Sequence, residues 1–176
     1  MTHVYYMMLK KALKEYGFDP EELLCFKSEE AQLQTVKQDG HNIRYIPNPS
    51  EDLQLEAVKQ DGHSIQYIPN PSEKVQLQAV KQNGYYIRYI PNPSEKVQLE
   101  AVKQNGNNIQ YILNPSEEAQ LEAVKQNGNS ILYIPNPSEK VQLEYVRNAN
   151  DIDYIYKLSP KHYTMLLKKL TVKDII

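Results

Sequence analysis

The fold is decided by the segment SEKVQLQAVKQNGYYIRYIPNP, residues 72–93, because the chain repeats it several times with few changes. Its first serine returns every 22 residues, at Ser28, Ser50, Ser72, Ser94, Ser116 and Ser138. A glycine stands twelve residues after each of the first five serines, at Gly40, Gly62, Gly84, Gly106 and Gly128. The chain therefore contains five full copies and the start of a sixth. Repetition at such a short, fixed period is typical of a solenoid.

The first half of each copy predicts a helix. Serine after Asn-Pro is a favoured N-cap, and the acidic residues that follow suit the first turn of a helix. Twelve residues later, a glycine follows a turn that contains lysine, which predicts a left-handed stop at the helix end. In the copy quoted above, the helix is expected over residues 72–83, about three turns.

This helix has two apolar sides. Val75 and Ala79 lie on one flank of a helical wheel, and Leu77 and Val80 lie on another. A helix this short is unstable alone, so we expect each copy to pack against the copies before and after it. The alanine recurs as Ala57, Ala101 and Ala123, and its small side chain lets neighbouring backbones come close.

The second half of each copy leaves two structures open. Residues 85–90 have apolar side chains at Ile87, Tyr89 and Ile90 and end before Pro91, so they form either one or two helical turns or a short strand. The absence of the leucine-rich consensus favours helical turns. The predicted fold is therefore all-α, a right-handed α-solenoid of 22-residue repeats that pair a helix with a short helix. The alternative is an α/β solenoid with one short strand per repeat.

The ends of the chain differ from the repeats, as the ends of a solenoid must. We expect an N-terminal helical cap over residues 1–27, the repeats over residues 28–149, and a degenerate repeat end with a C-terminal helical cap over residues 150–176, together one folded domain. Leu113 replaces the first linker proline in one copy, so that proline is not essential to the connection.

Composition narrows the function classes. The net charge of −2 gives no general attraction to phosphate, and Cys25 alone forms neither an intrachain disulfide nor a cysteine-rich zinc site. We found no apolar run long enough to span a membrane and no signal peptide, so we expect a cytoplasmic protein, in the producing cell or in its host.

The core sequence A-V-K-Q-N-G followed by I-x-Y, at residues 101–111, resembles the repeats of an uncharacterised family called domain of unknown function 4116. The resemblance extends over roughly residues 28–150. The alternation of a full helix with a very short one also looks like leucine-rich-repeat variants, which implies a helical solenoid. Neither resemblance implies a catalytic residue.

The positions that vary between copies are the candidate partner-binding residues, because a solenoid keeps its packing positions constant. They follow each glycine: His41, Asn42, Arg44, His63, Ser64, Gln66, Tyr85, Tyr86, Arg88, Asn107, Asn108, Gln110, Asn129, Ser130 and Leu132. Tyrosine and arginine are enriched at interface hot spots, so Tyr85, Tyr86 and Arg88 are the first candidates.

Three sets of repeated side chains are expected to be structural. The basic residues at the helix ends suit the helix dipole: Lys37, Lys59, Lys81, Lys103 and Lys125, continued by Arg147. In three copies a glutamate three residues earlier offsets the charge: Glu56, Glu100 and Glu122. An invariant glutamine, Gln32 in the first copy, is expected to bind main-chain groups of the adjacent linker. The repeated tyrosines are expected to be framework: Tyr45, Tyr67, Tyr89, Tyr111 and Tyr133.

The sequence shows no converging catalytic cluster, so we expect a non-catalytic protein without cofactor or metal. His41 and His63, near Asp39 and Asp61, form a conceivable metal or acid–base pair, but two drifted copies of one loop explain them better. The leading hypothesis is the binding or inhibition of a partner protein, possible for a viral or host-associated factor that blocks a host protein. The alternatives are single-stranded nucleic acid, read by the repeats, and a small ligand or nucleotide.

Overall fold

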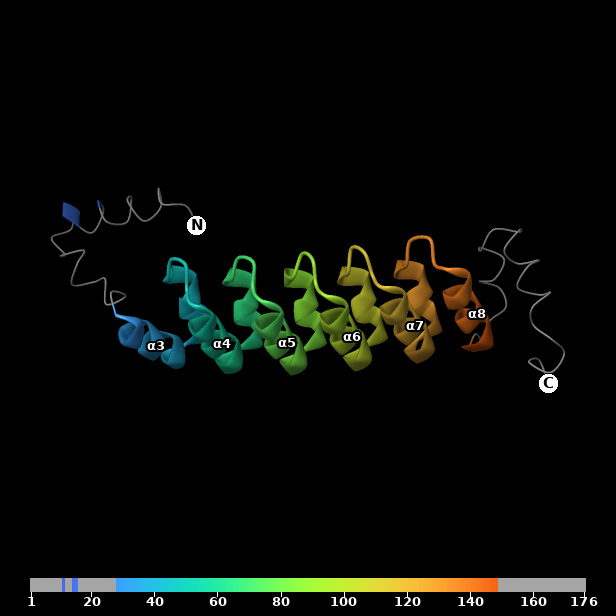
Figure 1. Ribbon diagram of the computed structural model, residues 1–176, viewed down its shortest axis with the longest axis horizontal. Coiled ribbons are helices and arrows are strands. Elements are labelled where there is room, and N and C mark those ends of the chain that lie inside the picture. The colour runs from blue at the N-terminus through green and yellow to red at the C-terminus, as the bar shows by residue number, and fades with distance from the viewer. Residues whose placement is uncertain (1–10, 12–13, 16–27, 149–176) are drawn as a thin grey trace. The chain divides into compact units, whose positions relative to one another are not determined.

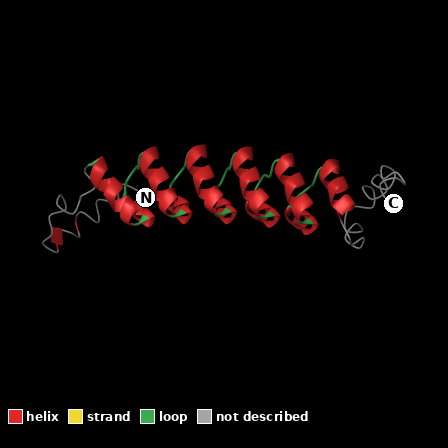
Figure 2. Cartoon of the chain, turned by 90° about the horizontal axis from the view of Figure 1, so that it is seen from below, coloured by secondary structure: helices red, strands yellow, loops and turns green. Residues whose placement is uncertain are grey.

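The computed structural model describes residues 11, 14–15 and 28–148 (Figure 1). Residues 28–148 contain helices and connecting loops and no strand (Figure 2). The all-helical prediction is confirmed there, and the alternative with one strand per repeat is wrong for these residues. The predicted caps and Cys25 lie outside the described residues, except for residues 11, 14 and 15.

Each repeat contains one α-helix and one 3₁₀ helix. The α-helices are α3 (Glu29–Gln38), α4 (Glu51–Gln60), α5 (Glu73–Gln82), α6 (Glu95–Gln104), α7 (Glu117–Gln126) and α8 (Glu139–Asn148). The 3₁₀ helices are η2 (Gly40–Tyr45), η3 (Gly62–Tyr67), η4 (Gly84–Tyr89), η5 (Gly106–Tyr111) and η6 (Gly128–Tyr133). This repeating pair is the predicted solenoid unit of helix and short helix, whereas its handedness stays a prediction.

The chain forms two compact units, Met1–Ala79 and Val80–Ile176, and the boundary falls inside α5. In the first unit, α3 packs against α4, and η2 packs against η3. In the second unit, α6, α7 and α8 lie side by side in sequence order, and η5 packs against both η4 and η6 (Figure 1). Within each unit, every repeat thus packs on the next one along the chain.

The serines begin the helices as predicted. The Ser28 hydroxyl oxygen accepts a hydrogen bond from the backbone N–H of Ala31 at 3.2 Å. The same bond recurs in four later copies, in which the accepting hydroxyl oxygens belong to Ser50, Ser72, Ser116 and Ser138. Ser94 is the exception, because its side chain makes no cap bond. Five of the six α-helices in residues 28–148 therefore have the expected cap.

The helix ends differ from the prediction. Asp39 follows α3 in an extended conformation, with φ −152°, and its N–H bonds to the carbonyl oxygen of Thr35. Its carboxylate accepts a hydrogen bond from the His41 N–H at 2.9 Å and so caps η2. The predicted left-handed glycine stop is wrong, because the residue before the glycine ends one helix and begins the next.

The core of each unit consists mainly of small and β-branched side chains. Alanine at the close-packed position is fully buried at Ala57, Ala79, Ala101 and Ala123. The isoleucine of each 3₁₀ helix is at most 1 % exposed in four copies: Ile43, Ile65, Ile87 and Ile109. The predicted helix flanks are buried at Val75 and Val80, whereas Leu77 is half-buried. Both flanks of the helix therefore contribute to packing.

The invariant glutamine closes the linker between repeats, as predicted. Gln54 donates a hydrogen bond from Nε2 to the carbonyl oxygen of Pro49 at 2.9 Å. The same bond recurs in the next four copies, from Gln76, Gln98, Gln120 and Gln142. The linker also contains Asn48, with φ 50°, in the left-handed region that asparagine tolerates.

Candidate partner-binding surface

The second residue after each glycine points into the fold. Ser64 and Ser130 are fully buried, and Asn108 is 5 % exposed. Asn42 and Tyr86, at the equivalent positions, are half-buried. We therefore leave the second position, one third of the predicted partner-binding residues, out of the candidate surface.

Two asparagines show what the second position does. Asn42 donates a side-chain hydrogen bond to the carbonyl oxygen of Thr35 at 3.1 Å, and Asn108 donates one to that of Ala101 at 2.9 Å. These carbonyls belong to the last turn of the preceding α-helix, and each also accepts a hydrogen bond from the N–H of the residue that ends the helix, Asp39 or Asn105. Asparagine at this position joins the two helices of one repeat.

The first and fourth residues after each glycine reach solvent. The exposed ones are Arg88, Gln110, Asn129 and Leu132. The half-buried ones are His41, Arg44, His63, Gln66, Tyr85 and Asn107. The structure therefore leaves these ten of the fifteen predicted residues at the surface of the 3₁₀ helices.

The repeated tyrosine at the fifth position belongs to the same surface. Tyr45 is 52 % exposed and Tyr133 is 45 % exposed, while Tyr67, Tyr89 and Tyr111 are half-buried. The sequence assigned these tyrosines to the framework because they do not vary. Within each compact unit, we call the first, fourth and fifth positions after the glycines the aromatic surface.

In the first unit, an arginine links the aromatic surface of two repeats. The Arg44 guanidinium lies 4.7 Å from the ring centroid of Tyr45 and 5.5 Å from that of Tyr67 in the next repeat. His41 meets the Tyr67 ring edge-to-face, with 5.6 Å between centroids. Both contacts are within the range of favourable cation–π and aromatic interactions.

In the second unit, Arg88 lies among three tyrosines. Its guanidinium is 4.9 Å from the Tyr85 centroid, 5.3 Å from Tyr89 and 5.8 Å from Tyr111, and it donates a hydrogen bond to the Tyr85 hydroxyl. The Tyr85 and Tyr111 rings meet edge-to-face at 5.1 Å and 87°. Among the described residues, no carboxylate forms an ion pair with Arg88. The exposed Arg88 guanidinium is therefore held in place by tyrosine rings and not by an ion pair with a described carboxylate.

In the last two full repeats, amides replace the aromatic and cationic side chains. The Asn107 side-chain oxygen accepts hydrogen bonds from Asn127 Nδ2 at 2.9 Å and from Ser130 Oγ at 3.1 Å. Gln110 donates from Nε2 to the Asn107 carbonyl oxygen at 3.0 Å. Leu132, which is 53 % exposed, adds an apolar side chain to the aromatic surface of the fifth repeat. The aromatic surface thus changes from cationic and aromatic to neutral and polar along the second unit.

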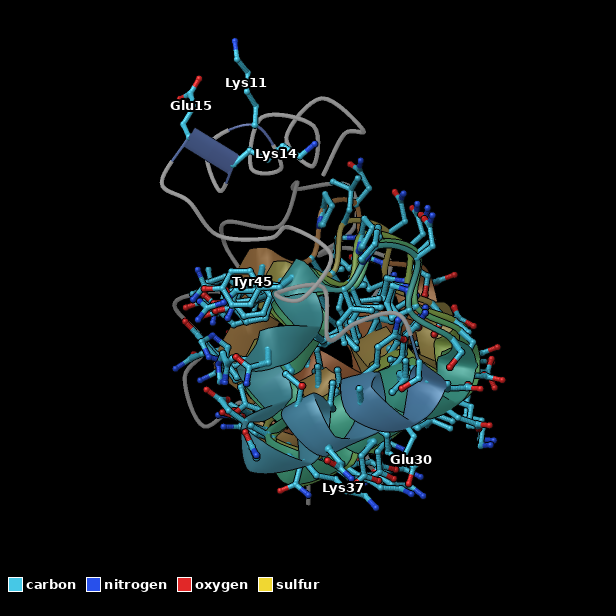
Figure 3. All side chains as sticks on the ribbon, turned by 90° about the vertical axis from the view of Figure 1, so that its left-hand side faces the viewer. Lys11, Lys14, Glu15, Glu30, Lys37 and Tyr45 are labelled. Carbon is cyan, nitrogen blue, oxygen red and sulfur yellow. The ribbon has the colours of Figure 1, made fainter. Side chains whose placement is uncertain are left out.

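The lysines lie on another side of the repeat. In the first copy, Tyr45 lies on a different side of the ribbon from Lys37 and Glu30 (Figure 3). Lys37 and its equivalents are all exposed: Lys59, Lys81, Lys103, Lys125 and Arg147. Arg147 pairs with Glu144 three residues before it, at 3.8 Å, the spacing predicted to offset the lysine charge. In the first copy, the basic residue is therefore not part of the aromatic surface.

A groove between α7 and α8 offers little for a small ligand. It is lined by Leu121, Lys125, Glu139, Lys140, Leu143, Glu144 and Arg147. Five of these seven side chains are charged, and ligand pockets are usually lined by apolar and aromatic groups. The groove therefore gives no support to the small-ligand alternative.

Across the parts of the chain that the structure describes, no helix has both the length and the apolar character that crossing a lipid bilayer requires.

Two overlapping stretches of the chain, residues 50–94 and 72–115, match the family model described as domain of unknown function (DUF4116). The two matches start 22 residues apart, from 50 to 72, so the second is the first moved along by one repeat. Each match covers about two repeats, and the repeats of this chain are similar to that family. No curated protein and no solved structure gives a significant match. The similarity to leucine-rich-repeat variants therefore stays a prediction.

Proposed function

We propose that this protein is a non-catalytic repeat protein that binds a partner protein through the aromatic surface. The observation that carries the proposal is the position of Arg88, exposed and surrounded by Tyr85, Tyr89 and Tyr111 without a carboxylate partner among the described residues. Arginine and tyrosine are the side chains most enriched at interface hot spots. Cation–π contacts fix the guanidinium before binding, which lowers the entropy lost in a complex.

The chemistry of this cluster indicates the kind of partner. A guanidinium offers two parallel hydrogen bonds to a carboxylate, and the tyrosine rings around it offer apolar area with polar hydroxyls. A partner segment that carries an acidic residue beside an aromatic or aliphatic one would complement both features. Arg44, between Tyr45 and Tyr67, presents the same chemistry in the first unit.

One observation supports a second use of the same surface, the binding of single-stranded nucleic acid. A tyrosine recurs in every full repeat, and aromatic rings at a fixed spacing are platforms on which bases of single-stranded nucleic acid stack. Against this use, the net charge is −2, and in the first copy the lysine lies on a different side from the tyrosine (Figure 3). Nucleic-acid affinity depends on neutralising phosphates, so a surface with few cations favours a protein partner.

The chain itself supplies the variant that tests the proposal. Tyr85→Asn, Tyr86→Asn and Arg88→Gln together convert the GYYIRY of η4 into the GNNIQY of η5, a sequence that forms the same 3₁₀ helix. We expect this triple variant to keep the fold and to lose most of the partner capture in a pull-down followed by mass spectrometry. Lys103→Gln, at an exposed position of the lysine series, is the control and should capture the partner as well as the unchanged protein does.

Equal capture by the triple variant would remove the Arg88 cluster from the interface and so contradict the proposal. Capture that disappears after nuclease treatment, or an affinity for single-stranded RNA that falls steeply with salt, would establish the nucleic-acid alternative instead. A circular dichroism spectrum of the triple variant identical to that of the unchanged protein shows that lost capture is not lost folding.

The mode of action and the compartment belong to the same proposal. A non-catalytic surface acts by occupying or bridging its partner, so inhibition is the simplest outcome of binding. We place this action in the cytoplasm of the producing cell or of its host, where a viral or host-associated protein would meet a host factor. Tagged protein expressed in host cells, and followed by microscopy and by the captured partner's activity, tests both points.

A further inference from the structure

Two histidines and an aspartate come together across two consecutive repeats. His41 belongs to η2, Asp61 lies between α4 and η3, and His63 belongs to η3. One potential ligand atom from each of the three lies within 4.8 Å of the others. All three side chains are half-buried, so an ion from solvent can reach them. This cluster lies within the first compact unit.

We propose that His41, Asp61 and His63 bind a zinc ion, which joins the first and second repeats. Imidazole nitrogen and carboxylate oxygen are ligands that Zn²⁺ accepts. Asp39 Oδ1 is 3.3 Å from His41 Nδ1 but does not belong to this group of three. Water completes the tetrahedron.

One pair of the proposed ligands already has near-correct spacing. Four ligands at 2.0–2.2 Å around a tetrahedral zinc ion lie about 3.4 Å from each other. His41 Nδ1 lies 3.6 Å from Asp61 Oδ2. The remaining separations, within 4.8 Å, require a contraction of at most about 1.4 Å, which rotation of half-exposed side chains supplies.

Backbone hydrogen bonds hold the carboxylate in position. Asp61 Oδ1 accepts a hydrogen bond from the His63 N–H at 2.8 Å, which leaves Oδ2 directed at His41. The His63 ring has a neighbour as well, because its Nε2 lies 3.0 Å from Gln66 Nε2. If His63 binds zinc through Nδ1, its Nε2 carries the proton. A flip of the Gln66 side-chain amide then places the amide oxygen where it accepts a hydrogen bond from this N–H. Partners of this kind orient ligand histidines in metal sites.

The pattern of residues across the repeats favours a metal over drift. The two copies with histidine after the glycine have aspartate before it, whereas the other three copies have asparagine before it: Asn83, Asn105 and Asn127. Asparagine caps the 3₁₀ helix equally well, because Asn105 Oδ1 accepts from the Asn107 N–H at 3.0 Å. The cap therefore does not require a carboxylate. Aspartate before the glycine and histidine after it occur together in two adjacent copies, and capping does not explain this pairing.

The test compares the full chain with His41→Asn/His63→Asn. Asparagine occupies this position in the fourth and fifth copies, as Asn107 and Asn129, so the variant is expected to fold. Isothermal titration with ZnCl₂ should give one tight site in the unchanged protein. The affinity should fall at least about 100-fold in the variant, because loss of outer-shell partners alone costs 10–100-fold. Only the unchanged protein should gain melting temperature with Zn²⁺.

His3, His162 and Cys25 are present in both proteins, so zinc bound by them appears equally in both titrations. Asp61→Asn alone should weaken binding while leaving the cap of η3 intact. Cobalt absorption bands of a tetrahedral site should appear in the unchanged protein and be lost in the double variant. Equal zinc affinity of the unchanged protein and the double variant would overturn the site, as would the absence of zinc binding by the unchanged protein.

Discussion

Gly106 lies against the backbone of Ala123 in the next repeat, so close that a Cβ atom on the glycine would be 2.8 Å from the alanine carbonyl oxygen. The same relationship joins Gly84 to Ala101 at 2.7 Å. Neither glycine has a positive φ, so sterics between repeats and not backbone conformation require the glycine. Glycine and alanine together set how closely each repeat approaches the next.

Gly106→Ala should therefore destabilise the protein. The added methyl group meets a backbone oxygen, which cannot rotate away, so the two repeats must separate slightly. Overpacking of this kind typically costs about 1–3 kcal/mol. Urea unfolding followed by circular dichroism measures the loss as a lower denaturation midpoint.

Gly128→Ala is the matched control. In that copy Tyr145 replaces the alanine, and a Cβ on Gly128 would lie 3.5 Å from the tyrosine ring, an ordinary contact. The substitution should be neutral, or stabilising by up to about 1 kcal/mol because alanine restricts the unfolded chain. Equal losses in the two variants would contradict the steric explanation.

The repeat, its period and its helix starts were predictable because they depend on local chemistry. Ser28, for example, accepts its cap bond from the N–H of Ala31, three residues later in the chain. The role of the glycine was not predictable in the same way. A glycine after a lysine-bearing turn usually ends a helix in the left-handed conformation. Here the contact that requires Gly40 comes from Ala57, seventeen residues later, and only the packed structure shows that contact.

The aromatic surface was predicted only in part. Comparison of copies separates constant from varied positions, but a constant position is not always a buried one. Tyr45 does not vary between copies and is half-exposed, because its ring interacts with Arg44 on the surface. Ser64 varies and is fully buried, because serine and asparagine both fit beside the preceding helix end. Exposure depends on the direction of each side chain on the 3₁₀ helix. That direction was not predictable, because the sequence left the second half of each repeat undecided between helix and strand.

Gln98 joins two linkers, so its loss should be more costly than that of the other glutamines. Its Nε2 donates to the carbonyl oxygens of Pro93 at 3.0 Å and Asn114 at 3.4 Å, and its Oε1 accepts from the Ser116 N–H at 2.8 Å. Gln98→Ala leaves these backbone groups without the glutamine, and an unsatisfied buried polar group costs about 1–3 kcal/mol. Chemical denaturation should show a loss of that size.

Gln120→Ala is the comparison for this prediction. Gln120 donates one hydrogen bond, to the Pro115 carbonyl oxygen, and its own Oε1 is buried without a partner. Removing that unpaired oxygen offsets part of the loss. We expect the free energy of unfolding to fall by less than in Gln98→Ala. A larger fall in Gln120→Ala would show that the bond between linkers contributes nothing.

The carboxyls of Glu95 and Glu118 predict a pH effect. A hydrogen bond to Glu118, followed by repulsion from its charge, raises the pKa of Glu95 above 4.5. A backbone hydrogen bond, followed by the bond with Glu95, lowers the pKa of Glu118. Glu95 therefore adds stability at low pH and loses it as the pH rises through its folded pKa. The contribution of Glu118 is present at higher pH and is lost as the pH falls through its folded pKa.

Glu95→Gln should accordingly be more stable than the unchanged protein at pH 7, where it removes a repulsion. This advantage should shrink at pH 4, where Glu95 of the unchanged protein carries its proton. Urea midpoints at the two pH values measure the change. Glu100→Gln removes one charge from the same helix, α6, and should not reproduce the pH dependence. If it does, net charge and not the pair is responsible.

Leu113→Pro should stabilise the fourth repeat. The other full copies carry proline here: Pro47, Pro69, Pro91 and Pro135. The preceding Ile112 has φ −102° and ψ 113°, close to the φ −92° and ψ 114° of Ile46 before its proline. The backbone is thus already in the extended region that a residue before proline requires.

The gain should be about 0.4–1 kcal/mol, because proline restricts the unfolded chain and the native backbone accepts it without strain. Leu113 is 76 % exposed, so the substitution removes no buried apolar contact. Leu113→Ala separates the two effects, since it deletes the exposed side chain without fixing φ, and its stability should remain near that of the unchanged protein. A gain of the same size in Leu113→Ala would assign the effect to the lost leucine and not to the restricted backbone.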